Sequence, residues 1–440
     1  MELTTLKEEP KKTEVGSYFV ANYPPFSVWS PSHLPAVNEA FDNPPQNDAR
    51  LGLYLHIPFC RKRCKFCYFR VYTDKNADEV ETYLSALSRE IDLYADRRGL
   101  TGRQFEFVYF GGGTPSFLSN AQLERVIERI NHRWTWSSAK EVTFECEPGT
   151  LKESKLETIK KIGVTRLSLG VEHFDDEILS SNGRAHKSPE IFRAWEWIRN
   201  VGFPQVNIDL IAGMLGETED KWKYAVEQAI KLDADSVTIY QMEVPFNTTI
   251  AREAKAAGGV SPVASWAQKR AWVDYAFKQF EAQGYKVSSA YTLVRPERHA
   301  GFVYRDSLWH GADLVGTGVA SFGHFQGVHY QNVDTWEQYI EKIEAGQLPL
   351  NRALPITEHQ KLIREMILQL KTGQIDASYF RQKFGEDIRQ EFAPQFSSLV
   401  AENFAEIAGD KISLNRQGLL RVDSLLHRFF EPEFQNVRYT

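Results

Sequence analysis

The chain has 440 residues, of which 42% are hydrophobic and 25% are charged, as in an ordinary soluble globular protein. Its length predicts one large domain and a smaller one, and its net charge of -6 excludes a general attraction to nucleic acid or to an anionic membrane surface. No apolar run approaches the roughly 20 residues of a membrane span, and residues 1–12 lack the apolar segment of a signal peptide. We therefore expect a cytoplasmic protein with no membrane span and no nucleic-acid partner.

Residues 1–50 are predicted to form an extended arm that lies over the main domain. They contain many prolines and show little hydrophobic periodicity. A disordered leader is the alternative, but a chain that stays disordered is normally poor in aromatic residues. Five aromatic residues lie close together in this segment and are expected to anchor it: Tyr18, Phe19, Tyr23, Phe26 and Trp29.

From residue 51 to residue 243 the pattern alternates between strands and helices. Residues 77–94 have the spacing of an amphipathic helix, and Ser119 with Gln122 forms a capping box that begins another. Strands separated by helices predict parallel βα units, although periodicity alone leaves a doubly wound sheet and a barrel both open. The predicted strands are residues 51–57, 105–110, 141–145, 166–171, 206–211 and 236–242.

The rest of the chain is predicted to be more varied. A long amphipathic helix over 265–283 precedes a mixed segment over 285–340. Residues 356–430 then have the pattern of helical and strand fragments around a set of apolar side chains.

Three of the four cysteines, Cys60, Cys64 and Cys67, lie on a short loop directly after the first predicted strand. Soft thiolates on such a loop suit an iron-sulfur cluster, and three of them leave one iron of a 4Fe-4S cluster without a protein ligand. Structural zinc is the alternative, with His56 as the nearest candidate for a fourth ligand. The loop also carries four cations, which we expect to lower the thiol pKa values: Arg61, Lys62, Arg63 and Lys65.

A glycine run, Gly111-Gly112-Gly113, followed by Thr114 and Pro115, ends the second predicted strand. Glycines tolerate positive φ and let a ligand approach the backbone closely, although a glycine run is also common in simple turns.

Charged residues lie at or just after the later strands. Glu145 and Glu147 fall on one face of the third strand, a pair that is also compatible with acid-base catalysis. Glu172 and Arg184 follow the fourth strand and Asp209 lies in the fifth. Arg184 and Asp209 could instead form one structural ion pair.

The Tyr54–Cys60 segment, the C-x3-C-x2-C spacing and the Gly-Gly-Gly-Thr-Pro run together resemble the radical S-adenosylmethionine (radical SAM) superfamily. More narrowly, the chain resembles the oxygen-independent coproporphyrinogen III oxidase family and its relatives over nearly its whole length. The resemblance implies an α/β fold, a partial (βα)6 TIM-like barrel with its chemistry at the carboxyl ends of the strands. It also implies these parts: an N-terminal arm over 1–50, the core barrel over 51–290, a segment that closes the substrate side over 291–350, and a small, mostly helical domain over 351–440.

The same resemblance implies a 4Fe-4S cluster on the three cysteines and S-adenosylmethionine (AdoMet), with two AdoMet molecules expected. Five residues match family positions that contact the AdoMet at the cluster: Tyr54, Gly112, Gly113, Thr114 and Glu145. For Tyr54, a place in the barrel core is an equal alternative. Glu172, Arg184 and Asp209 match positions that bind AdoMet, including a second molecule beside the first. The family usually has Gln where this chain has Glu172, and a carboxylate can only accept hydrogen bonds.

Four functions remain open at this point. Porphyrinogen oxidation by hydrogen abstraction is favoured by the arm and by the segment from Asp313 to Gly323, although many such oxidases have a fourth cysteine where this chain has Phe69. Methyl or methylene transfer from a second AdoMet, heme binding by a chaperone and radical opening of heme are the alternatives. The expected partners are a flat or conjugated small-molecule substrate and an electron donor such as flavodoxin or ferredoxin. The roles of Glu147 and His310 are left undecided, with packing preferred for His310.

Overall fold

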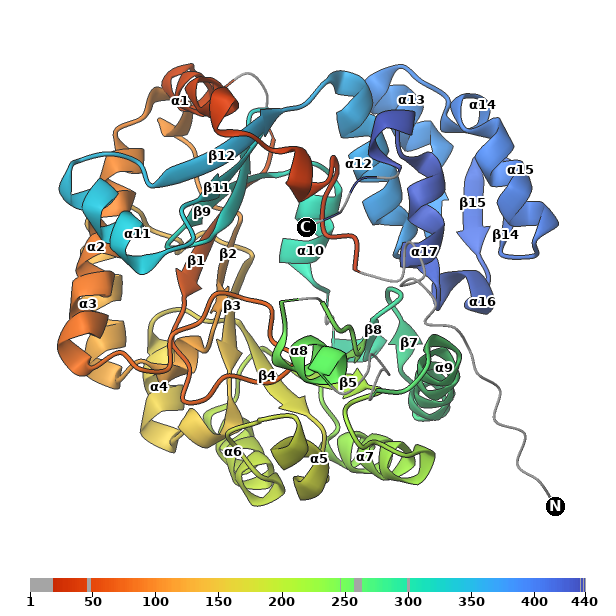
Figure 1. Cartoon of the computed structure of the whole chain (residues 1–440), viewed down its shortest axis with the longest axis horizontal. Helices are drawn as coiled ribbons and strands as arrows, with labels where there is room; N and C mark the ends of the chain where they lie inside the picture. The colour runs from red at the N-terminus through yellow and green to blue at the C-terminus, as the bar shows by residue number, and fades with distance from the viewer. Residues whose placement is uncertain are drawn as a thin grey trace.

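The computed structural model describes residues 19–45, 49–245, 247–256, 263–298, 301–435, 437 and 439. Tyr18, one of the expected anchors of the arm, lies outside the described residues. A twelve-stranded sheet runs through the larger part of the molecule (Figure 1). At its centre are the six predicted strands, in chain order and parallel: β1 (Leu51–Ile57), β2 (Phe107–Gly112), β3 (Glu141–Cys146), β4 (Arg166–Glu172), β5 (Gln205–Ala212) and β6 (Ser236–Gln241).

Further strands extend both edges of this sheet. Beside β6 lie the short antiparallel strands β8 (Thr292–Val294) and β7 (Lys286–Val287). Beside β1 the chain returns as the parallel strand β9 (Asp313–Thr317). Three antiparallel strands follow outward: β10 (Phe322–Phe325), β11 (Val328–Asn332) and β12 (Leu350–Pro355). Among the described strands, the two edges β12 and β7 do not pair with each other, so the sheet is an open, partial barrel.

Helices cover the outer side of the sheet, and their ends follow from local sequence (Figure 1). The predicted capping box of Ser119 and Gln122 begins α3, and Ser265 with Gln268 begins α9 in the same way. None of the described helices is long and apolar enough to cross a membrane. The helices of this layer and of the connections after it are α2 (Ala77–Ala95), α3 (Asn120–Asn131), α4 (Glu153–Lys161), α5 (Asp176–Ser181), α6 (Ser188–Val201), α7 (Glu219–Leu232), α8 (Thr249–Ala256), α9 (Trp266–Ala282), α10 (Val303–Trp309) and α11 (Trp336–Glu344).

The N-terminal arm is less extended than predicted, because it contains the helix α1 (Leu34–Asp42). Pro35 lies in the first turn, where the missing N–H needs no partner, and Val37, Ala40 and Phe41 form one buried face. Before this helix the arm follows the edge of the sheet, since Ser30 exchanges backbone hydrogen bonds of 2.9 and 3.0 Å with Ala353 in β12. The arm therefore covers the edge of the sheet that β12 would otherwise expose.

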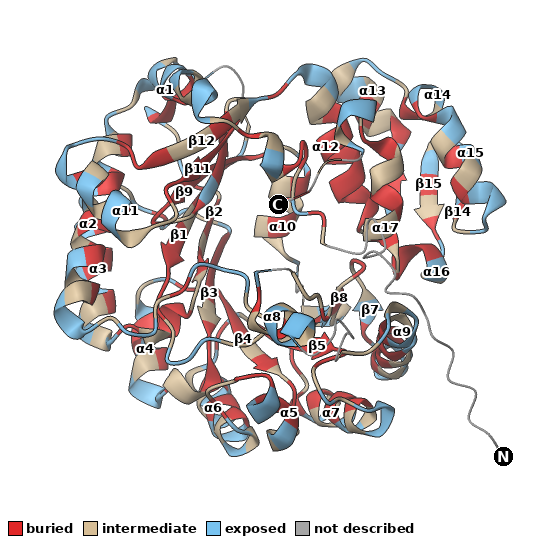
Figure 2. Cartoon of the chain, viewed as in Figure 1, coloured by how far each residue is buried: buried red, intermediate tan, exposed pale blue. Residues whose placement is uncertain are grey.

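The residues after β12 build a second core, separate from that of the barrel (Figure 2). Its central helix is α12 (Glu358–Leu370), in which every residue from Leu362 to Leu370 is buried. Val20 and Tyr23 of the arm pack into this core, so the arm joins the two parts of the molecule. The other elements are α13 (Ala377–Phe384), α14 (Ile388–Glu391), α15 (Ala393–Ala401), α16 (Arg416–Leu419) and α17 (Val422–Leu426), with a small sheet of β13 (Gln374–Asp376), β14 (Ala405–Ala408) and β15 (Lys411–Leu414).

Candidate functional site

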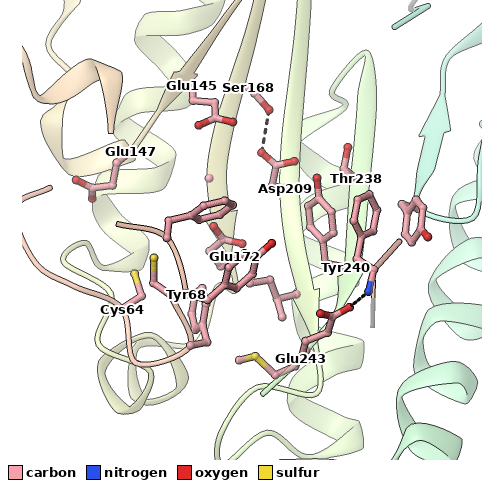
Figure 3. Close-up of a pocket in the computed structure, with 18 of the residues that line it drawn as sticks. Cys64, Tyr68, Glu145, Glu147, Ser168, Glu172, Asp209, Thr238, Tyr240 and Glu243 are labelled. Carbon is pink, nitrogen blue, oxygen red and sulfur yellow. Dashed lines mark hydrogen bonds between the residues drawn. The ribbon is translucent and has the colours of Figure 1, made fainter. Parts of the chain in front are cut away.

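A cavity of about 470 Å³ lies at the carboxyl ends of the central strands. Figure 3 shows Glu145, Ser168 and Asp209 projecting from neighbouring strands into the space that Cys64 and Tyr68 enter from the loop after β1. The C-terminal domain closes another side with Leu420, Arg421 and other residues near the start of α17. The cavity thus occupies the position where enzymes with parallel barrels carry their active sites.

The loop after β1 brings all three cysteines of the motif to this cavity. Its two ends are joined by hydrogen bonds between the backbones of Cys60 and Tyr72 (3.0 Å) and of Tyr72 and Pro58 (2.8 Å). Its middle is fixed by the Lys65 N–H, which donates to the carbonyl of Asn182 at 2.9 Å. The three cysteines are free and half-buried, and each lines the cavity.

Burial dominates the protonation of these thiols. It raises the pKa of Cys60 to about 12 and that of Cys67 to about 11. Arg63 of the loop lowers the pKa of Cys67 as expected, but burial outweighs this effect and both thiol pKa values are raised overall. The loop cations pair with other groups, since Arg61 binds Glu147 at 2.9 Å and Lys65 binds Glu253 at 3.1 Å.

The environment of the thiols fits an iron-sulfur cluster. Thr114 Oγ1 donates a hydrogen bond to Cys60 Sγ at 3.3 Å, and Arg184 Nη1 lies 3.4 Å from Cys64 Sγ. Such donors are typical partners of cluster sulfurs. Among the described residues, no group of three or more His, Cys, Asp or Glu side chains is close enough to hold a single metal ion. Thiolates that each bind a different iron of a cluster do not need to converge on one point.

The glycine run is required by the close approach of two strands. Strand β2 continues through Gly112, two residues beyond the predicted end, and Gly112 has a φ of 113°. A Cβ at Gly112 would lie 2.6 Å from the ring of His56, and one at Gly113 would lie 2.8 Å from the backbone of Pro58. Gly112, Gly113 and Thr114 all line the cavity. Their backbone is thus exposed beside the cysteine loop, where the resemblance places the AdoMet at the cluster.

Glu145 lines the cavity and is half-buried. It accepts a hydrogen bond of 2.7 Å from Tyr109 Oη, but burial outweighs this bond and raises its pKa to about 7. Tyr54 lies next to this pair, with its ring stacked on Tyr109 at 5.9 Å and its hydroxyl 3.3 Å from His56 Nδ1. Tyr54 is therefore part of the packed barrel interior beside the cavity, and its contact with AdoMet stays a prediction.

Glu172, Arg184 and Asp209 come together at the same cavity, but in different pairs from those expected. Arg184 lies 3.5 Å from Glu172 and donates to the carbonyl of Gly170 at 2.7 Å. Asp209 instead accepts hydrogen bonds from Ser168 Oγ (2.8 Å) and Asn207 Nδ2 (2.9 Å), as Figure 3 shows for Ser168. The alternative of an Arg184–Asp209 ion pair is thus wrong. Arg184 Nε stays buried without a hydrogen-bond partner.

Glu172 has an unusual backbone. Its φ is 64°, at a register shift between β4 and β5, and burial raises the pKa of its carboxyl to about 7. A left-handed conformation at a residue with a Cβ is strained, and such strain is concentrated at functional sites. The irregularity lies at the end of β4, where Glu172 contacts Arg184.

Glu147 has a structural role that the sequence left undecided. Its carboxylate accepts hydrogen bonds of 3.0 and 2.9 Å from Arg61 and lies 3.1 Å from His186 Nδ1. Although burial raises the pKa of Glu147, these hydrogen bonds lower it to about 2. Glu147 therefore holds the cysteine loop in place through Arg61, and His186 holds Glu147 from the other side. No motif in the sequence indicated this role for His186. His310 is exposed and packs against Tyr379, away from the cavity.

Comparisons with known proteins agree with this geometry. The sequence model of the radical SAM superfamily matches residues 54–229, so this part of the chain is a radical SAM domain. The model of the HemN C-terminal domain matches residues 356–421.

Relatives of two kinds support this assignment. The heme chaperone HemW of Bacillus subtilis is 28% identical over 372 residues, covering 83% of this chain and 96% of that protein. The oxygen-independent coproporphyrinogen III oxidase of Pseudomonas aeruginosa is 28% identical over 388 residues, covering 85% of this chain and 81% of that protein. A solved structure of coproporphyrinogen III oxidase (HemN) from Escherichia coli has a TM-score of 0.81 at 23% identity, over 93% of this chain and 96% of that one. The predicted fold class is thereby confirmed.

Proposed function

We propose that the protein is a radical SAM enzyme that removes a hydrogen atom from a flat, conjugated or tetrapyrrole-like substrate. This proposal rests on the residues that line the cavity. Three free thiols and a group of solvent-exposed aromatic rings line the same space. When bound, a 4Fe-4S cluster would pass one electron to AdoMet, breaking its C–S bond to give methionine and the 5'-deoxyadenosyl radical. The electron would come from a donor such as flavodoxin or ferredoxin.

The aromatic rings support a flat substrate. Tyr68, Phe69 and Tyr240 are 45%, 49% and 42% exposed, and all three line the cavity. The rings of Tyr68 and Phe69 lie 4.5 Å apart, and Tyr240 stacks with Tyr291 at 6.3 Å. Exposed aromatic surface that gathers in one concave place is typical of a binding site, and ring faces favour contact with another conjugated plane.

The chain's own residues would then have distinct tasks. Cys60, Cys64 and Cys67 would hold the cluster, while Gly112 and Gly113 would expose backbone groups to AdoMet. Glu145 would present its carboxyl to the AdoMet amine, and a cation beside it would favour its charged form.

Anaerobic incubation of the reconstituted protein with AdoMet and dithionite, followed by mass analysis, tests this proposal. We expect 5'-deoxyadenosine as the product, and none when dithionite is left out. Additional S-adenosylhomocysteine would indicate methyl transfer instead. A cluster-loaded protein that forms neither product under these conditions would contradict an enzymatic role.

We also expect a second AdoMet beside the first, bound near Glu172, Arg184 and Asp209. These residues line one side of the cavity. Arg184 lies 3.5 Å from Glu172, and Asp209 accepts hydrogen bonds from neutral donors only, while Arg184 Nε is buried without an acceptor. In equilibrium dialysis, the reconstituted wild type should bind two AdoMet molecules and Asp209→Ala should bind one. A stoichiometry of one in the wild type would contradict the second site.

Heme binding is the second candidate, because a relative with 28% identity is named a heme chaperone. The cavity could hold a porphyrin plane, but none of its described lining residues is a histidine, so a cysteine, Met242 or a tyrosine would have to bind the iron. Hemin titration separates the two functions. Tight stoichiometric hemin binding, together with one bound AdoMet and no deoxyadenosine, would favour the chaperone.

A further inference from the structure

The turn between α16 and α17 brings a cation from the C-terminal domain to the cavity. Arg421 occupies this turn and lines the cavity. The turn is held in place on both sides, because Leu420 packs into the barrel core and its carbonyl accepts a hydrogen bond of 3.0 Å from Gln241 Nε2. Arg421 is therefore presented to the cavity by a fixed backbone.

The guanidinium of Arg421 has no anionic partner among the described residues. No described carboxylate lies within ion-pair distance of it, and its Nε is buried without a hydrogen-bond acceptor. Its one recorded side-chain contact is with the ring of Phe404, 4.7 Å from the guanidinium carbon. A buried donor that lacks an acceptor costs free energy, so a ligand that supplies an acceptor gains affinity there.

Two lysines close to this side of the cavity already have partners. Lys371 donates to the carbonyl of Val20 at 2.6 Å and lies 2.9 Å from Asp423. Lys269 donates to the carbonyl of Met242 at 2.6 Å. Asp423, two residues after Arg421, is neutralised by Lys371 and also accepts a hydrogen bond from Tyr291. The positive charge of Arg421, a residue that lines the cavity, is thus not neutralised by any described carboxylate.

A neighbouring acceptor is unpaired in the same way. Gln241 Oε1 is buried without a partner, and the amide cannot be reversed without losing the bond from Nε2 to the carbonyl of Leu420. Arg421 Nε is therefore a donor without an acceptor, and Gln241 Oε1 is an acceptor without a donor. The two residues lie close together, because Gln241 binds Leu420, the residue before Arg421, and both line the cavity.

We propose that Arg421 is a specificity-determining residue that binds a carboxylate of the substrate, with Gln241 Oε1 accepting a hydrogen bond from a donor next to that carboxylate. The planar guanidinium fork suits a carboxylate, which it can bind through two parallel hydrogen bonds. This inference rests on the proposed function, since it fixes which end of the conjugated substrate faces the C-terminal domain. The carboxylate end is held there, while the rest of the molecule extends past Tyr240 toward the cysteine loop.

A matched pair of flat probes tests the inference. 1-Pyrenebutyrate carries a carboxylate, and 1-pyrenebutanol has the same ring system and chain with a neutral hydroxyl. Affinities for the cluster-loaded, AdoMet-bound protein are measured anaerobically by calorimetry. We expect the wild type to bind pyrenebutyrate on the order of ten-fold or more tightly than pyrenebutanol, because a hydrogen bond to a charged group contributes more than a neutral one. Arg421→Met should abolish this preference, and Arg421→Lys should restore part of it.

Lys62→Met is the matched control, since it removes one positive charge from the cysteine side of the same cavity. It should leave the preference unchanged. Equal affinities of the wild type for the two probes, or an equal loss in Lys62→Met, would overturn the inference. The spectral response of the cluster to AdoMet shows whether Arg421→Met is folded. Formation of 5'-deoxyadenosine in the same samples tests the proposed function separately, because that reaction does not involve Arg421.

Discussion

Two opposite walls of the cavity are built in different ways. The strand wall consists of Glu145, Ser168, Glu172 and Asp209, which lie on the adjacent strands β3, β4 and β5. Its polar groups bind one another or nearby groups across the sheet, as in the 2.8 Å hydrogen bond from Ser168 to Asp209. Strand pairing fixes most of this geometry, and Arg184, from the segment after α5, adds the contact to Glu172.

The domain wall consists of Phe19, Tyr291, Leu420, Arg421 and Asp423, which come from the arm, the barrel and the C-terminal domain. Lys371 joins these parts, since its ammonium lies 3.6 Å from the ring centre of Phe19 and 2.9 Å from Asp423. The strand wall is therefore suited to cofactors that need one fixed geometry. The domain wall depends on contacts between distant segments, and it is where the substrate preference of this chain would be set.

Loss of one cluster ligand should have the largest effect. We expect Cys64→Ala to lose bound iron and all AdoMet cleavage, because two remaining thiolates cannot hold a 4Fe-4S cluster in the required position. Cys146→Ala is the matched control, since this fourth cysteine is buried beside the strand wall and lies outside the motif. Iron and sulfide analysis and 5'-deoxyadenosine formation check both variants. A colourless wild type with one stoichiometric zinc would contradict the cluster.

Removal of Lys371 should weaken the domain wall while leaving the strand wall intact. Its ammonium is buried, and Lys371→Met leaves Asp423 with an uncompensated charge, which costs about 3 kcal/mol in the free energy of unfolding. Lys361→Met, which breaks a surface pair with Glu358, should cost less than about 1 kcal/mol. Chemical denaturation measures both. If the two variants are equally stable, the Lys371 contacts do not hold the domain wall together.

The two walls also differ in how far the sequence predicted them. The strand wall follows from local patterns, because apolar runs located the strands, and Glu145 and Asp209 could be placed at their ends. The three cysteines and the glycine run could be identified from their spacing and from their positions after predicted strands. Even here the suggested alternative of an Arg184–Asp209 ion pair was wrong, since Arg184 contacts Glu172 and not Asp209. The left-handed backbone at Glu172, which no local pattern signals, turns its side chain toward Arg184.

The domain wall could not be predicted from one sequence. Lys371 and Val20 are 351 positions apart, and nothing near either residue indicates that they meet. Arg421 sits in a short turn between two helical fragments, where a charged residue is normally solvent-exposed. His186 likewise had no motif around it, although its partner Glu147 was noted. Helix α1 was missed because many prolines surround it, while Pro35 itself is compatible with a first helical turn.

Substitution at the glycine run should distort the boundary between β1 and β2. Gly112→Ala places a Cβ 2.6 Å from the ring of His56 at a φ of 113°, and we expect it to lower the free energy of unfolding by about 2 to 3 kcal/mol. Gly346 has a φ of 70°, in the left-handed helical region, and nothing lies within 4 Å of the place that a Cβ would take, so Gly346→Ala measures the strain of a positive φ without a clash. It should cost about 1 kcal/mol. Equal losses in thermal unfolding would show that the His56 contact is unimportant.

The smallest expected effect is a pH dependence that arises from the strand wall. Burial raises the pKa of Glu145 from 4.5 to about 7, so the folded protein without cofactors favours the protonated carboxyl. Its contribution to stability is fully present below pH 4.5 and is lost as the pH rises through 7. The whole shift would correspond to about 3 kcal/mol, but the carboxyl is only half-buried and water screens part of the effect. From this group we expect the free energy of unfolding to fall by on the order of 1 to 2 kcal/mol over that window. Glu172, whose pKa is also raised to about 7, should add a slope of the same sign.

Denaturation at several pH values between 5 and 8 measures this slope in the apoprotein. Glu145→Gln mimics the protonated carboxyl and should flatten part of the decline, leaving the part that belongs to Glu172. Glu147→Gln is the control, because the pKa of Glu147 is lowered to about 2 and its contribution is lost only as the pH falls toward that value. It should leave the slope between pH 5 and 8 unchanged. In the reconstituted protein, Glu145→Gln should also keep the cluster but bind AdoMet more weakly. An unchanged slope together with unchanged AdoMet affinity would make Glu145 a packing residue, and the strand wall would then hold AdoMet through its glycine backbone alone.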